Sequence, residues 1–190
     1  MVSAPGLRLV PLRCPGCGSG LQGQGGGVFL YCPACGSGYE LSADDRLDPV
    51  PVSFAVYTPG SVAYHPFWVF DAALTLGARD AKHTLMQLLG SSAGLTRLFR
   101  ERERIDFYSP GFASDIDAER SWGLHLTSEQ PRLSSTGRQP RVDDLTLSQS
   151  DARAVAEHLF LVSEIEQADV VRNLDYTLHL TNPRVLAIGL

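Results

Sequence analysis

The chain has 190 residues, of which 44% are hydrophobic and 19% are charged, a balance that allows one ordinary domain and a small additional module. Its net charge is −5, with +1 over residues 1–42 and −6 over the rest, so neither part has the basic surface that nucleic-acid-binding domains usually carry. The sequence has neither a run of about 18 apolar residues, as a membrane helix needs, nor the apolar stretch of a signal peptide, and we therefore expect a cytoplasmic protein.

All four cysteines lie in two copies of one short motif, CPGCGSG at residues 14–20 and CPACGSG at residues 32–38. A C-x-x-C pair brings two sulfurs close to one ion, and the glycine after each pair permits the positive φ that such a turn needs. Two pairs together supply four thiolates in a tetrahedral arrangement, which is typical of structural zinc sites. The sequence therefore predicts one structural Zn²⁺ with four ligands: Cys14, Cys17, Cys32 and Cys35.

Residues 12–42, which contain both motifs, resemble a zinc ribbon. The resemblance implies the same four cysteines as ligands, in a small module that could not bury a sufficient core without its metal. Iron in a rubredoxin-like site is an alternative, because the same four sulfurs suit both metals, but few aromatic residues lie near the motifs. A redox-active C-x-x-C is a further alternative, and the absence of a βαβ context for the doubled motif argues against it.

The segment between the two motifs is rich in glycine, GLQGQGGGVF at residues 20–29. A phosphate-binding loop follows a strand and opens a helix, whereas this segment leads into the extended run VFLYC. We therefore interpret it as the tip of a hairpin.

The polar segment SADDRLDPVP, residues 42–51, predicts a linker, which divides the chain into a zinc ribbon over residues 1–44 and an α+β domain over residues 45–190. Strands are predicted over residues 52–57 and 62–76, the second of them long and bent. Three Tyr-x-Pro triplets, at Tyr57, Tyr64 and Tyr108, belong at strand edges or bulges because proline lacks a donor for the ladder. They indicate bent strands that pack four aromatic residues into the core: Tyr64, Phe67, Trp68 and Phe70. An exposed aromatic recognition surface is the alternative.

The run YHPFWVFDA, which follows the second cysteine motif, is similar to a Y-x-P-F-W strand in bacterial zinc-ribbon proteins of unassigned function. The similarity extends over about residues 14–71 and implies a ribbon followed by a β-containing domain. It implies no activity and no catalytic residue.

The pattern changes to helical spacing over residues 79–104, where two short amphipathic helices are predicted around a GSSAG break. This pair either docks a partner or completes the core. An extended run at 105–112 and a helix at 114–126 follow, and the strongest helix of the chain is predicted over 150–169. Ser148 and Asp151 have the spacing of a capping box before it. The C-terminal residues predict a hairpin, with strands over 174–180 and 185–190 and a turn at Thr181-Asn182-Pro183.

The sequence shows no G-x-S-x-G, P-loop or H-E-x-x-H motif, and its five histidines are scattered: His65, His83, His125, His158 and His179. A closed set of four thiolates leaves no coordination position at which a metal could activate water. We therefore predict no catalytic residue, no cofactor apart from Zn²⁺ and no enzymatic activity.

The leading hypothesis is a non-catalytic accessory or scaffold subunit of a larger protein assembly, in which the zinc ribbon serves folding and protein docking. One alternative is nucleic-acid binding through the ribbon, although only Arg8 and Arg13 lie near the motifs. The other is an enzyme subunit whose site forms only with a partner, near His65 or His125.

Overall fold

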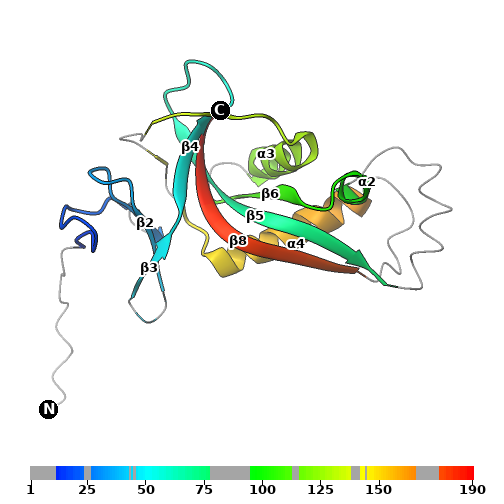
Figure 1. Cartoon of the computed structure of the whole chain (residues 1–190), viewed down its shortest axis with the longest axis horizontal. Helices are drawn as coiled ribbons and strands as arrows, with labels where there is room; N and C mark the ends of the chain where they lie inside the picture. The colour runs from blue at the N-terminus through cyan, green and yellow to red at the C-terminus, as the bar shows by residue number, and fades with distance from the viewer. Residues whose placement is uncertain are drawn as a thin grey trace, which may run out of the picture.

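The described residues form two β-sheets, which are joined by the backbone of residues 47–56 (Figure 1). This computed structural model describes the following residues: 12–23, 27–42, 44, 46–77, 95–112, 116–137, 142–143, 145–165 and 176–190. Three helices pack against the larger sheet, which confirms the predicted α+β class with a small cysteine-containing module at the N-terminal end.

The smaller sheet is antiparallel and has three strands in the order β1 (Phe29–Tyr31), β2 (Gly38–Leu41) and β3 (Leu47–Val50). Together with the two cysteine motifs it forms what we call the cysteine module, the described residues of 12–50. The sequence predicts a linker over residues 42–51, and this is wrong for β3, which pairs with β2 along its whole length. Pro49 is tolerated there because β3 is an edge strand, where a missing N–H breaks no ladder bond.

The larger sheet has five strands in the order β6-β5-β8-β4-β7. The bounds of these strands are β4 (Val52–Val56), β5 (Tyr64–Leu76), β6 (Ile105–Pro110), β7 (Ser134–Ser135) and β8 (Tyr176–Gly189). β4 runs parallel to β8, and the other neighbouring pairs are antiparallel. The long pair β5 and β8 forms the curved centre of the sheet (Figure 1).

β5 is the long bent strand that the sequence predicts. Between Val69 and Asp71 its register against β8 shifts, because the single residue Phe70 faces two residues of a bulge in β8, Asn182 and Pro183. The four aromatic residues of its first half are buried, as predicted, with exposed fractions of 7% or less: Tyr64, Phe67, Trp68 and Phe70.

The predicted C-terminal hairpin is wrong, because residues 176–189 form the single strand β8. Asn182 takes up a positive φ of 50° within the strand, and its side chain bonds Asp71 across the bulge. β4 pairs only with residues 185–189, so Pro183 falls where β8 has a strand neighbour on one side only among the described residues. Thr181-Asn182-Pro183 therefore makes a kink in a strand and not a turn.

The helices are α2 (Leu95–Glu101), α3 (Ile116–Glu129) and α4 (Gln149–Ile165). They confirm the helices predicted around residues 95–104, 114–126 and 150–165. The helix predicted over 79–89, before the GSSAG break, and the end predicted at 166–169 lie outside the described residues. The predicted capping box is present at the start of α4, where the Asp151 N–H donates to Ser148 Oγ over 3.1 Å and Ser148 Oγ donates to Asp151 Oδ2.

The larger sheet has an apolar cluster on each face. Alternate residues of β5 point to opposite faces, so this strand contributes side chains to both clusters. Trp68 and Phe70 pack in a cluster with residues of α2, α4 and the cysteine module. Phe67 and Val69 pack on the other side, where Leu126 of α3 covers them. The core thus has two layers, and the cysteine module belongs to the first.

α3 also covers the outer edge of the sheet, where β6 has no further strand neighbour. Thr127 Oγ1 accepts the N–H of Tyr108 at 3.0 Å, and the Gln130 side chain accepts the N–H of Asp106 and donates to its carbonyl oxygen. These side chains take the place of a neighbouring strand.

No helix in the described part of the chain is both long and apolar enough to cross a membrane.

Candidate metal centre

The two cysteine motifs fold into two turns with the same hydrogen bonds. In the first turn the Gly18 N–H donates to the Cys14 carbonyl oxygen at 2.8 Å, and in the second the Gly36 N–H donates to the Cys32 carbonyl oxygen at 2.7 Å. The N–H of the first cysteine of each motif bonds the carbonyl oxygen of the serine five residues later, again at 2.8 Å in both copies. The repeated sequence therefore gives a repeated local structure.

Gly18 and Gly36 have φ angles of 75° and 81°, in the left-handed region that favours glycine. This conformation closes each turn and holds both sulfurs of a motif on one side of it. The sequence prediction that these two glycines need a positive φ is confirmed.

The four cysteine sulfurs gather in one cluster. All of the Sγ atoms lie within 4.8 Å of one another. Two pairs that join the motifs are closest, with 3.5 Å from Cys14 to Cys35 and 3.5 Å from Cys17 to Cys32, and none of the cysteines forms a disulfide. A tetrahedral ion with metal–sulfur bonds of about 2.3 Å requires sulfurs about 3.8 Å apart, so the cluster fits one ion with four thiolate ligands.

The cluster is half enclosed. Cys14 and Cys32 are 3% and 0% exposed, whereas Cys17 and Cys35 face solvent. Tyr39, Leu21 and Leu47 pack around the buried pair. The first cysteine of each motif therefore lies on the buried side of the cluster, and the second cysteine lies on its solvent-exposed side.

Polar groups around the cluster favour the ionised form of some sulfurs. The Tyr39 hydroxyl lies 3.5 Å from Cys14 Sγ, and its hydrogen bond lowers the pKa of Cys14 to about 6 despite burial. Hydrogen bonds to Ser37, 3.2 Å away, lower the pKa of Cys35. A hydrogen bond from the backbone of Cys35 lowers the pKa of Cys32, but burial and the neighbouring thiols outweigh it and raise this pKa to about 11. A thiol that binds a metal must lose its proton, and hydrogen bonds from the chain favour this loss at two of the four cysteines.

Sequence reasoning missed Tyr39 and Ser37 as neighbours of the sulfurs. Ser37 has a recognisable signal, because the serine two residues after the second cysteine recurs in both motifs. Tyr39 has none, because the first motif has Leu21 at the corresponding position.

The module is fixed to the rest of the chain by apolar contacts at its inner face. Phe29 and Tyr31 of β1 are 7% and 4% exposed and belong to the same core cluster as Trp68. The ring of Tyr31 meets that of Phe54 edge-to-face, with 5.6 Å between ring centroids. The cysteine cluster is consequently built on a sheet that is itself part of the main core.

A glycine and a carboxylate complete this attachment. Gly38 leaves no room for a side chain, because a Cβ there would lie 2.2 Å from Val52 Cγ2. Glu40 Oε1 accepts the N–H of Gln149 at 2.8 Å, in the first turn of α4, where a negative charge also suits the helix dipole. β2 is therefore held against both β4 and α4.

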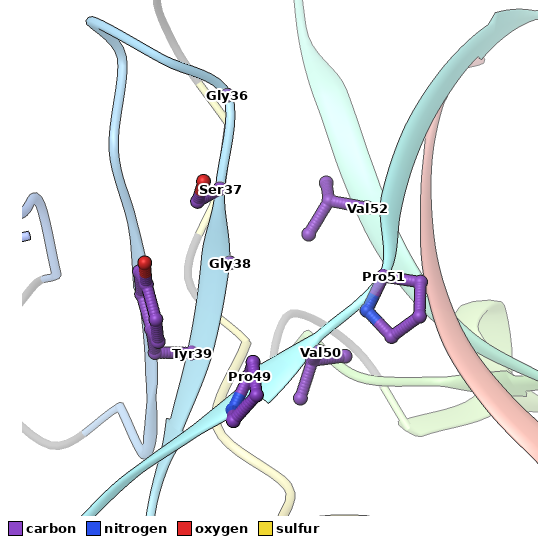
Figure 2. Close-up of a pocket in the computed structure, with 8 residues that line it drawn as sticks. All are labelled: Gly36, Ser37, Gly38, Tyr39, Pro49, Val50, Pro51 and Val52. Carbon is purple, nitrogen blue, oxygen red and sulfur yellow. The ribbon is translucent and has the colours of Figure 1, made fainter. Parts of the chain in front are cut away.

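A groove with a volume of about 470 Å³ lies where the module meets β4. Residues 36–39 form one wall and residues 49–52 the other, and Figure 2 shows Val52 pointing from β4 toward Gly38. The groove contains neither His65 nor His125, the two positions around which a partner-dependent enzyme site is hypothesised.

The described histidines lie apart from one another and from the sulfurs. His65 Nδ1 pairs with Asp143 at 2.8 Å, His125 Nε2 bonds the Tyr57 hydroxyl at 2.7 Å, and His179 Nε2 bonds Thr75 at 3.1 Å. His158 is exposed on α4, and His83 lies outside the described residues. Among the residues that the structure describes, only the four cysteines form a group that can hold a metal ion.

Comparison with known proteins gave no match to a family model, to a curated protein or to a solved structure.

Proposed function

We propose that the cysteine module holds one structural zinc ion and that the protein is a non-catalytic accessory or scaffold subunit of a larger protein assembly. The observation that carries this proposal is the cluster of four sulfurs within 4.8 Å. Four thiolates from the chain fill a tetrahedral zinc ion, so no position is left for a substrate or a reactive water. The module is a zinc ribbon in this proposal, and the exposed side of its turns is the surface that contacts a partner.

The donor set supports zinc over other metals. Four thiolates in a tetrahedral arrangement suit zinc and iron, and in a protein of a reducing compartment such a set usually holds zinc. When bound, the ion would tie the two turns together and so stabilise the sheet that carries Phe29 and Tyr31. In this role the metal supplies folding energy and not chemistry.

Native mass spectrometry of the tagged full-length protein, purified gently from its source cells, tests the metal and the assembly in one measurement. We expect one zinc ion per chain and a stoichiometric set of companion proteins. Iron in place of zinc, or no metal at all, would contradict the zinc site. A zinc-loaded chain without companions would contradict the assembly role and leave the zinc site standing.

A second measurement separates docking by the module from its role in folding. Ser37→Ala and Cys14→Ser both alter the surroundings of the sulfurs, but only Cys14→Ser removes one of the four ligands, and the folding of the main domain is measured for each variant beside companion binding. We expect Cys14→Ser to lose the zinc ion and the companions, whereas Ser37→Ala keeps both. Normal companion binding by the Cys14→Ser protein would refute docking through the module.

A further inference from the structure

β8 has a long edge whose backbone groups pair with no other described strand. β5 pairs with β8 from Tyr176 onward, but on the opposite side β4 covers only residues 185–189. The last contact of this kind before β4 is at Pro51, whose carbonyl oxygen accepts the Val185 N–H. The residues that precede Pro51 belong to β3, which pairs within the cysteine module and not with β8. Residues 176–184 of β8 therefore extend beyond the end of β4, and β5 is their only described strand neighbour (Figure 1).

One hydrogen bond shows in which direction the backbone N–H and C=O groups of residues 176–180 point. Arg153 of α4 donates to the carbonyl oxygen of Leu180, which must point away from β5 to be reached. In an antiparallel pair a residue directs its N–H and C=O to the same side, and the side alternates along the strand. Tyr176 and Leu178 therefore also direct their backbone groups away from β5.

The outer edges of this sheet are protected, whereas among the described residues the edge of β8 over 176–180 is covered only at Leu180, by the Arg153 side chain. α3 covers the β6 edge with the side chains of Thr127 and Gln130, and at the other end of the sheet β7 is only two residues long. Proteins usually protect a free edge with charged residues, and the run YTLHLT over 176–181 contains none. An uncharged, regular edge of this kind favours pairing with another strand.

We propose that two copies of this chain pair antiparallel through residues 176–180 of β8 and join their larger sheets into one. With the two-fold axis at Leu178, Tyr176 lies opposite Leu180 of the partner subunit, and Leu178 lies opposite the partner's Leu178. These are the residues whose backbone groups point outward, so each opposed pair can exchange two hydrogen bonds. The Leu180 carbonyl oxygen has a second lone pair and can keep its bond from Arg153.

The side chains along the edge suit this partner. Tyr176, Leu178 and Leu180 face the core side of the sheet, and the first two are only half-buried in one copy. Antiparallel pairing places them beside the same apolar residues of the other copy, while Thr177 and His179 meet on the exposed face. The paired segment itself carries no formal charge at neutral pH, so the pairing places no like-charged side chains of residues 176–180 opposite each other. This inference is independent of the metal.

Sedimentation equilibrium of the full-length protein, over about a hundredfold range of concentration, tests the dimer, because dimerisation depends on concentration. We expect a reversible dimer. The double substitution Thr177→Lys with His179→Lys brings like charges opposite each other across the two-fold axis and should weaken the dimer about tenfold or more. The corresponding double substitution to Glu should do the same, and mixing the Lys and Glu proteins should restore a dimer.

The mixing step shows that both variants are folded, and a matched control tests the location. Ser121→Lys with Ser128→Lys adds the same charge to exposed positions of α3, at the opposite edge of the sheet, and should leave the dimer unchanged. A wild-type protein that stays monomeric, or a dimer that the Lys variant retains, would overturn the proposal. So would a monomer whose Tyr176 and Leu178 amides are protected from hydrogen exchange, because another part of the same chain would then cover the edge.

Discussion

Gly18 and Gly16 belong to the same turn but have different physical reasons to be glycine. Gly18 has a φ of 75°, and no heavy atom lies within 4 Å of the position of a Cβ. A side chain there has room, but its backbone conformation is strained. At Gly16 a Cβ would make ordinary contacts of 3.6 Å with the Tyr39 hydroxyl and 3.7 Å with Cys14 Sγ, and the second motif has Ala34 at this position.

We therefore predict that Gly18→Ala destabilises the module with its proposed zinc ion by about 1–2 kcal/mol, the usual cost of a left-handed conformation for a residue with a Cβ. Gly16→Ala is the matched control and should change stability little. Competition with a coloured zinc chelator measures the apparent affinity, which we expect to fall roughly tenfold for Gly18→Ala alone. Equal losses for the two variants would contradict this account of the turn.

Asp71 of β5 lies next to the bulge of β8. Its carboxylate accepts a hydrogen bond from Asn182 at 2.7 Å and another from Arg184 at 2.7 Å, and these interactions lower its pKa. A lowered folded-state pKa contributes stability above the unfolded value, which is about 3.9, and this contribution is lost as the pH falls through the folded value.

We predict that Asp71→Asn lowers the free energy of unfolding by about 1 kcal/mol at pH 7, a figure reduced for solvent screening because the side chain is 29% exposed. The difference between wild type and variant should shrink as the pH falls below about 4, where the wild-type carboxylate also becomes protonated. Urea titrations at several pH values measure it. A difference that does not change with pH would mean that Asp71 acts through its shape and not its charge.

At the scale of elements, α4 begins with a cap formed by side chains. Ser148 Oγ accepts the N–H of Asp151, and it also lies 2.8 Å from Ser150 Oγ. We predict that Ser148→Ala lowers the free energy of unfolding by about 1 kcal/mol, the typical value of an N-cap. Ser150→Ala removes a hydroxyl two residues away, keeps the cap and should cost less. Chemical unfolding of both variants compares them, and an equal loss would argue against the cap.

Helices and strands could be predicted where local chemistry determines them. The spacing of apolar residues and the Ser148–Asp151 box locate α4, and the aromatic run of β5 locates a buried strand. β8 could not be predicted as one strand, because Asn182 and Pro183 form a common turn sequence. Only the neighbours decide the matter: β5 runs along both halves of β8, and the Asn182 side chain binds Asp71 across the bulge.

The same distinction applies to the metal centre. The four cysteines could be identified from their spacing alone, since a C-x-x-C turn is a local structure. Tyr39 and the contacts of the module with Phe54 could not, because they depend on how the small sheet packs on the larger one. β3 was not predicted for a related reason, since Pro49 within it and Pro51 just after it indicate a linker unless the strand is known to lie at an edge.

At the scale of the whole molecule, the cysteine module and the main domain share one core. Phe29 and Tyr31 belong to the cluster that contains Trp68, a fully buried residue whose Nε1 donates to the Leu147 carbonyl oxygen. Loss of the proposed metal ion should therefore disturb more than the two cysteine turns, because an unfolded module would uncover one side of this cluster.

We predict that a strong zinc chelator changes the fluorescence of Trp68 and lowers the melting temperature of the main domain. A Trp122→Phe variant leaves Trp68 as the single tryptophan of the chain, so the signal reports this core alone. The expected result is a red shift of the emission together with zinc release. Zinc release with unchanged emission would show that the module unfolds without affecting the core.

The shared core also limits how this module can be exchanged between proteins. Residues 12–50 moved to another chain would leave Phe29 and Tyr31 in water, and the recipient would have to offer a matching apolar face. The donor chain would lose the cover of Phe54 and the Glu40 carboxylate at the start of α4. The cysteine module of this protein therefore cannot be transferred alone. A fusion protein that keeps the module folded must also include the strands on both sides of Pro51, β3 and β4.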